Sequence, residues 1–181
     1  FYFVHTADFL VAKQVATPWI DNIFGRGGGP MTIGQIAEIL VLAAIPVVAK
    51  RTTRKTLLAV GLLAYIARFA VFAYAPTAEF VYPALALHGL CFGCVFFVCF
   101  MIIDEETPND VRATAQSLFN LVIVGLGIIV GNYASGQFAA LAERPDKSID
   151  YEKLFSIPMW IAVGCLALLL VAYPGGRNKE A

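Results

Sequence analysis

Six long hydrophobic segments restrict what this chain can fold into. Most of them approach or exceed the roughly 20 residues that a helix needs to cross about 30 Å of hydrocarbon. Because lipid offers the backbone no hydrogen bonds, each spanning segment must satisfy its own amide and carbonyl groups, as a helix does. The sequence therefore predicts an all-α membrane protein with six transmembrane helices, which we place at residues 1–23, 31–50, 56–75, 79–103, 111–139 and 155–173.

Composition supports a membrane environment. Hydrophobic residues make up 59% of the chain and charged residues 14%, whereas soluble domains have about 45–50% and about 25%. This composition predicts that lipid surrounds the chain, and the net charge of zero suggests no nucleic-acid partner. Phe1 opens a hydrophobic stretch without a methionine or a basic region, which predicts no signal peptide and a fragment that begins inside or just before a helix.

The cysteines do not indicate a metal or redox site. All four fall in apolar runs, at Cys91, Cys94, Cys99 and Cys165. The CxxC spacing of the first two lacks a second pair of ligands, and cysteine is a common small packing residue in cores. We therefore expect no metal and no cofactor.

The charges of the loops predict an orientation in the membrane. The short loop 50–55 carries four basic residues, Lys50, Arg51, Arg54 and Lys55, and short basic loops stay in the cytoplasm. Alternation then places loop 104–110 and the C-terminus in the cytoplasm as well. The acidic residues Asp104–Glu106 are interpreted as a solvated cluster or, alternatively, as a charge latch between helix ends.

Two polar residues stand out in the second hydrophobic segment. Gln35 and Glu38 are three residues apart, so they share one face of a helix. Glu38 lies roughly 10 Å from the start of that helix, which is deep for a short side chain to reach the interface. A carboxylate at such depth costs several kcal/mol, so it predicts a functional site. The alternative is a structural pair with a neighbouring helix.

Other polar and small residues are consistent with helices that surround such a site. Gln14 and Thr17 form a second i, i+3 pair, and the two pairs can face one another near the middle of the membrane. Arg68 needs a partner that the sequence does not name, and scaffolding and substrate contact both stay open. His88 is interpreted as a hydrogen-bonded core residue.

Small residues predict where helices approach closely. They are Gly89 and Gly93 in the fourth segment and Gly127, Gly131 and Ser135 in the fifth. Near the first pair, Phe92, Phe96 and Phe97 follow at helical spacing, and such an aromatic stripe more often packs than binds. Hydrolase and nucleotide-binding signatures are missing from the sequence, so a transporter fits the polar and small residues better than an enzyme does.

Six stretches, in order along the chain, resemble the nucleoside:proton symporter family of the major facilitator superfamily. The combination of GQxxE on one helix with LHG on a later one is more specific than the basic loop, which is general to the superfamily. The stretches are Gln14–Pro18, Met31–Glu38, Lys50–Leu58, Ala67–Phe69 with Phe72 and Tyr74, Leu87–Phe92 and Arg112–Gln116.

The resemblance implies a fold and a function. The chain is expected to be the C-terminal six-helix half of a carrier of the inner (plasma) membrane, whose missing N-terminal half completes the site. That carrier imports nucleosides by proton symport, with alternating access around a midplane site. The alternatives are a superfamily carrier for a sugar or another metabolite, and a membrane scaffold or enzyme in which Glu38 merely pairs with Arg68.

The resemblance also implies the roles of particular residues. Gln14 and Gln35 are expected to bond the base or ribose, and Glu38 to carry the coupling proton. Phe92 and Phe96 match positions that supply aromatic contacts. Thr17 matches a substrate-binding position. Thr17 stands where better-known members have asparagine, and Phe92 where they have tyrosine. Both differences remove or shorten a polar side chain, which bears on substrate preference more than on transport.

Overall fold

The structure is a computed structural model that describes residues 2–15 and 28–173. Within these residues the regular structure is helical, apart from an isolated bridge between Glu143 and Ile149. The elements are α1 (Tyr2–Ala12), α3 (Gly28–Val48), α4 (Arg54–Tyr74), α5 (Ala78–Cys91), the π-helical η1 (Phe92–Phe97), α6 (Val98–Glu106), α7 (Arg112–Asn120), the π-helical η2 (Leu121–Leu126), α8 (Gly127–Ala142) and α9 (Tyr151–Ala172).

Five helical rods in the described residues are long and apolar enough to cross a membrane. Three of them are α3, α4 and α9. The other two are composite: α5, η1 and α6 run on continuously over Ala78–Glu106, and α7, η2 and α8 over Arg112–Ala142. This agrees with the all-helical architecture predicted from the sequence.

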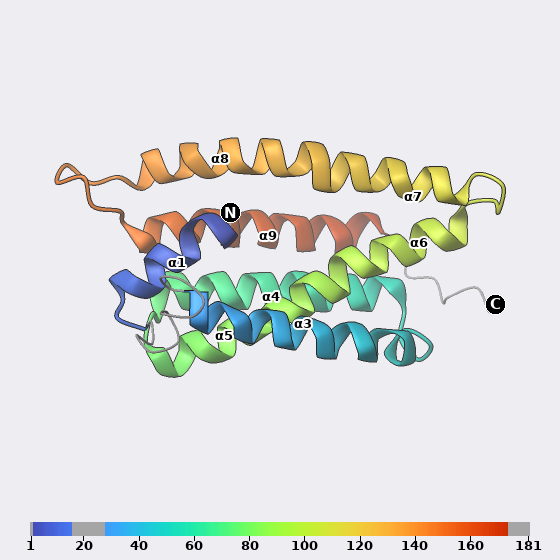
Figure 1. The fold of residues 1–181 in the computed structure, drawn as a ribbon, viewed down its shortest axis with the longest axis horizontal. Coiled ribbons are helices and arrows are strands. Elements are labelled where there is room, and N and C mark those ends of the chain that lie inside the picture. Colours follow the sequence, from blue (N-terminus) through green and yellow to red (C-terminus); the bar gives the residue numbers. More distant parts are fainter. Residues whose placement is uncertain (1, 16–27, 174–181) are drawn as a thin grey trace.

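The rods lie side by side, and the chain turns at alternate ends of the bundle (Figure 1). The loops 49–53 and 107–111 lie at one end, and the loops 75–77 and 143–150 lie at the other. At the first end, the Nζ of Lys55 donates to the carbonyl oxygens of Leu170 and Tyr173, both at 2.8 Å. The basic loop therefore shares its end of the bundle with the end of α9, as the predicted alternation requires.

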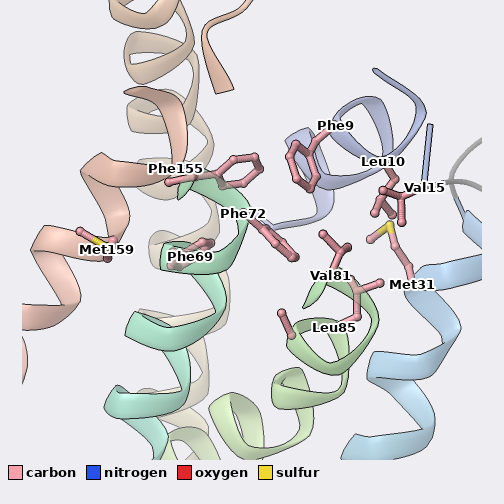
Figure 2. Close-up of a cluster of buried hydrophobic side chains, with 12 residues drawn as sticks. Phe9, Leu10, Val15, Met31, Phe69, Phe72, Val81, Leu85, Phe155 and Met159 are labelled. Carbon is pink, nitrogen blue, oxygen red and sulfur yellow. The ribbon is translucent and has the colours of Figure 1, made fainter. Parts of the chain in front are cut away.

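Helix α4 is central, because it packs against α5, η1, α6 and α9. Its side chains Phe69 and Phe72 join a buried cluster that ties in α1 and α9 (Figure 2). Within that cluster the ring centroids of Phe9, Phe72 and Phe155 lie 5.0–5.3 Å apart. Aromatic pairs at this spacing stabilise beyond the area they bury, so this cluster seats α1 on the rest of the bundle.

The first helix ends earlier than the sequence predicts. It stops at Ala12, whereas the hydrophobic pattern placed a helix over residues 1–23, of which residues 16–23 lie outside the described part of the chain. Gln14 then adopts a left-handed conformation with φ 56°. The N–H of Val15 donates to the carbonyl of Leu10 at 2.9 Å, and the N–H of Gln14 donates to the carbonyl of Val11 at 3.1 Å. These two bonds form a Schellman cap. An apolar pattern misses such a cap when glycine does not mark it.

The predicted close approach at Gly89 and Gly93 is confirmed. A Cβ on Gly89 would lie 2.5 Å from the carbonyl of Ala37, and one on Gly93 would lie 2.6 Å from a methyl group of Val41. Both contacts are with α3, so these glycines let α5 and η1 lie directly against it. The consequence is that Nε2 of His88, next to Gly89, lies 3.6 Å from Oε2 of Glu38, next to Ala37.

The predicted ladder in the fifth segment is wrong for two of its three members. A Cβ on Gly131 would meet nothing within 4 Å among the described residues, and one on Gly127 would meet only a carbonyl of its own rod. Ser135 alone is buried. The reason is that α8 lies along the outside of the bundle (Figure 1), where Gly127 and Gly131 face no other helix among the described residues.

Candidate functional site

The site begins with Gln35 and Glu38 on α3. They lie on one face because residues three apart in a helix are neighbours. Gln35 is exposed, and the side chain of Glu38 is 24% exposed. Helix α3 holds them in an otherwise apolar surface, where Ile36, Ile39 and Leu40 are also exposed. The structure thus leaves an amide and a carboxyl group side by side and accessible from one face.

Glu38 meets a partner from another helix, as the structural alternative anticipated. Its Oε2 lies 3.6 Å from Nε2 of His88 on α5. On the other side of the imidazole, Nδ1 lies 2.8 Å from Nη1 of Arg68 on α4. The structure therefore places His88 between Arg68 and Glu38. It also confirms that His88 is a buried, hydrogen-bonded residue.

Arg68 is held by aromatic rings as well as by His88. Its side chain is 1% exposed, and its guanidinium carbon lies 5.2 Å from the ring centre of Tyr65 and 4.9 Å from that of Phe69. Rings at this distance attract a cation through their negative faces. The partner of Arg68 that the sequence did not identify is thus the imidazole of His88, and the rings of Tyr65 and Phe69 flank the same guanidinium. A buried guanidinium needs several such contacts to replace water.

Close packing of α3 on α5 makes the contact with Glu38 possible. A Cβ on Gly34 would lie 3.1 Å from Cβ of His88, and one on Gly89 would lie 2.7 Å from the backbone nitrogen of Glu38. Both glycines sit within a few residues of the pair they bring together. Side chains at either position would hold the helices apart and lengthen the contact.

Phe92 and Phe96 lie in the π-helical segment η1, which the sequence did not reveal. Their ring centroids are 5.2 Å apart with an interplanar angle of 22°, so the rings are stacked. Phe92 is 36% exposed, and Phe96 is partly buried. Single π-helical turns inside α-helices are frequent at functional sites. The segment follows His88 by one turn and packs against α3.

The first polar pair is only partly placed by the structure. Gln14 is exposed and lies in the turn after α1 rather than on a helix. Thr17 lies outside the described residues. The i, i+3 geometry predicted for these two residues is therefore wrong at Gln14, and their meeting with Gln35 and Glu38 stays a prediction.

A second polar contact, between α1 and α8, was not anticipated from the sequence. Nε2 of His5 lies 2.7 Å from the hydroxyl oxygen of Ser135 and 3.3 Å from its carbonyl oxygen. Ser135 belongs to the small-residue ladder, and its burial marks where α8 does touch the bundle. The helical spacing of Ser135 was visible in the sequence, but its partner is 130 residues away.

Charged side chains join the helix ends at the basic end of the bundle. Arg54 at the start of α4 bonds Glu105 near the end of α6, with Nε donating to Oε2 at 3.1 Å. Asp104 accepts from Nε2 of Gln116 on α7 at 3.1 Å and pairs with Arg112 at 3.5 Å. The acidic cluster thus connects α6 to α4 and α7, which is the geometry of the latch alternative.

These features define a class of protein. Apolar rods long enough to span a bilayer carry ionisable and amide side chains that are open on one side, and polar groups in such segments are generally functional. The chain belongs to the nucleoside H+ symporter family, because a model of that family matches residues 1–176. It is an integral, multi-pass membrane protein, and the resemblance inferred from its motifs is confirmed.

Two relatives from Escherichia coli (strain K12) are transporters. The chain is 32% identical over 111 residues to the nucleoside permease NupG, an alignment that covers 59% of this chain and 27% of the permease. It is 27% identical over 134 residues to xanthosine permease, covering 72% of this chain and 30% of that protein. The chain therefore spans about a third or less of these relatives, which are transporters and not enzymes.

A solved structure shows the same fold. The chain resembles the crystal structure of a mutant of the nucleoside transporter NupG with a TM-score of 0.81 and 23% sequence identity, over 94% of this chain and 43% of that one. This likeness confirms the all-α membrane fold, matching part of a larger transporter.

Proposed function

We propose that this chain is the C-terminal six-helix half of a proton-coupled nucleoside carrier. Its family and the names of its relatives support a nucleoside as the substrate. The part of NupG that it matches, 43% of that structure, supports a second half that completes the site. The substrate then binds between the halves, and transport proceeds by rocking one half against the other.

The observation that carries the proposal is the arrangement on α3 and η1. The exposed amide of Gln35 and the partly exposed carboxyl group of Glu38 share a face of α3, and the stacked rings of Phe92 and Phe96 lie on the segment packed against it. An amide both donates and accepts hydrogen bonds, as a nucleoside does. An exposed aromatic ring can stack on a base.

The remaining roles follow from chemistry and position. Glu38 carries the coupling proton, because its carboxyl group can be neutral or charged and is open on one side. Gln14 and Thr17 are assigned to substrate binding from the preceding segment. The basic loop 50–55 and the C-terminus face the cytoplasm of the inner membrane, because short basic loops are retained there.

The proposal is tested by uptake of labelled uridine and adenosine into cells that express the full-length protein, at acid and neutral external pH. Wild-type uptake should rise in acid. Glu38→Gln should lower uptake at least about tenfold and abolish its rise in acid, because a bond to a charged group is worth about 1.5–3 kcal/mol and the amide cannot carry a proton.

The matched control is Glu79→Gln, which removes an exposed carboxylate from the first turn of α5, far along the helix from the site. It should behave as the wild type does. Membrane abundance is measured for every variant. Wild-type protein at full abundance that takes up neither nucleoside would contradict the nucleoside assignment, and a Glu38→Gln variant that retains acid-stimulated uptake would contradict the proton role.

A further inference from the structure

One imidazole connects two charged groups that come from two other helices. His88 lies on α5, with Nδ1 at 2.8 Å from the guanidinium of Arg68 on α4. Its Nε2 lies 3.6 Å from the carboxyl group of Glu38 on α3. The side chain of His88 is 9% exposed, whereas that of Glu38 is 24% exposed. The accessible end of this chain of contacts is therefore the carboxyl group.

The chemistry of Arg68 determines which nitrogen of His88 holds the proton. A guanidinium has only donors and stays protonated in proteins. In the 2.8 Å contact the guanidinium therefore donates and Nδ1 accepts. A neutral imidazole with Nδ1 as acceptor has its proton on Nε2, which is the nitrogen that faces Glu38. A second proton would place an N–H on Nδ1 against the N–H of Arg68.

We infer that His88 is a positioning residue for Glu38, held neutral by Arg68 so that its Nε2–H orients the carboxyl group while the coupling proton binds to Glu38 alone. This inference rests on the proposed function, because it takes Glu38 to be the proton carrier. The proton reaches Glu38 from its exposed side and not through the imidazole. In either protonation state the carboxyl group presents an oxygen to the Nε2–H of His88, so the contact persists in both states.

The groups around His88 allow this assignment. Helices α3, α4 and η1 pack against α5. Glu38 and Arg68 contact His88 directly, the ring of Tyr65 contacts Arg68, and Cys91 lies three residues after His88 on α5. Phenols and thiols in water titrate at about pH 10 and about 8.5. Near neutral pH the charge of this group of side chains therefore changes at Glu38 or at His88, and the contact with Arg68 favours Glu38.

The backbone is shaped for the contact. Gly34 faces Cβ of His88, and Gly89 lies against the backbone of Ala37 and Glu38, with less room than a Cβ needs at Gly89. The glycines thus set the distance between α3 and α5 at the level of the pair. A merely incidental contact between two long side chains would not need the backbones to approach this closely.

Two substitutions separate positioning from proton transfer. His88→Gln supplies an oxygen to accept from Arg68 and an N–H that can face Glu38, but it does not titrate. It should keep proton-driven uptake within about threefold of the wild type, with the same pH profile. His88→Leu supplies neither an acceptor for Arg68 nor an N–H that faces Glu38, so it should lower uptake at least about tenfold and move the midpoint of the pH profile.

The variants are compared in the full-length protein, with counterflow exchange of nucleoside as a readout that does not require proton coupling. Loss of acid-stimulated uptake in His88→Gln while exchange persists would overturn the inference, because His88 would then carry the proton itself. A His88→Leu variant identical to the wild type would overturn it as well. If the wild type moves no nucleoside, it is the proposed function that fails.

A spectroscopic measurement tests the arrangement even if His88→Leu does not fold. Nitrogen NMR of histidine-labelled protein, with the signal of His88 assigned by its loss in His88→Gln, distinguishes the two neutral tautomers from the imidazolium. We expect the Nε2–H tautomer throughout the range from about pH 5 to about 8 in which free histidine changes charge. An imidazolium signal that grows in on acidification within this range would overturn the inference.

Discussion

At the scale of single residues, Glu38 shows how far a sequence reveals a site. A carboxylate inside an apolar helix is costly wherever it occurs, so its presence alone indicates function or a partner. The identity of the partner depends on which helix lies opposite. Here it is His88, fifty residues away in the chain, and Arg68 lies behind it.

A second residue-scale feature is the strained conformation of Gln14. Its φ of 56° is costly for a side chain with a Cβ, by roughly 1–2 kcal/mol. Gln14→Gly should therefore raise the free energy of unfolding by about 0.5–1 kcal/mol, measured as an increase in melting temperature. If Gln14 bonds the nucleoside, the same variant should raise KM for uptake.

The control for this prediction is Gln14→Asn, which tolerates the left-handed conformation and retains a shorter amide. It should recover part of the affinity that glycine loses. A Gln14→Gly variant with unchanged KM would remove Gln14 from the binding site, and one that is less stable would contradict the cap seen at Val15 and Leu10.

Phe92 carries a prediction about affinity. Stacking of a base on an aromatic ring is worth about 1–3 kcal/mol by alanine substitution, and Phe92 is partly exposed beside Phe96. Phe92→Ala should therefore raise KM for nucleoside about tenfold or more, with little change in protein abundance. Phe92→Tyr keeps the ring and should stay close to the wild type. Equal KM values for the alanine and tyrosine variants would rule out stacking.

At the scale of helices, the contact of α3 with α5 positions the site. It depends on Gly89, where an added Cβ would lie 2.5 Å from the carbonyl carbon and oxygen of Ala37. These are backbone atoms, which cannot rotate away as a side chain can. The helices must therefore separate to admit any side chain at Gly89, and the contact between Glu38 and His88 lengthens with them.

Gly89→Val should consequently lower the free energy of unfolding by about 1–3 kcal/mol, the usual cost of overpacking, and reduce uptake in parallel. Thermal unfolding of the purified full-length protein in detergent measures the first effect. Gly164→Val on α9 is the matched control, because a Cβ there would meet none of the described residues within 4 Å, and its melting temperature should stay near that of the wild type. Equal destabilisation by both substitutions would contradict the packing argument.

At the scale of the whole molecule, the alternating loops predict an orientation that can be measured. We expect Thr52 to face the cytoplasm and Ser148 the outside, because the loops that contain them lie at opposite ends of the bundle (Figure 1). A membrane-impermeant thiol reagent should label Ser148→Cys in intact cells and Thr52→Cys only after the membrane is opened. The exposed Cys165 is replaced by serine in both variants.

The reverse pattern would place the basic loop outside and contradict the positive-inside assignment. Labelling of both positions in intact cells would indicate leaky cells, which labelling of a cytoplasmic marker protein detects. For each variant, labelling in intact cells is compared with labelling after the membrane is opened. A difference in expression between the two variants therefore does not affect the result.

The hydrophobic segments of this sequence determine its helical membrane fold and the approximate bounds of its spanning helices. The polar residues inside an apolar segment identify Gln35 and Glu38 as candidate site residues. These properties depend on the polarity of each side chain and on its spacing from neighbours within one helix, and both can be taken directly from the sequence. The family resemblance of the motifs at Met31–Glu38 and Leu87–Phe92 was also visible in the sequence, because each motif is a short continuous stretch of residues.

Tertiary structure decided what depends on distant parts of the chain or on subtle backbone geometry. The placement of His88 between Arg68 and Glu38, the contact of His5 with Ser135, and the outer position of α8 all arise from packing between helices. The cap at Gln14 and the π-helical turn at Phe92 depend on hydrogen bonds that shift by a single residue. Apolar periodicity is a pattern averaged over several residues, so it does not detect a shift of a single hydrogen bond. It also does not indicate which other helix packs against a given face.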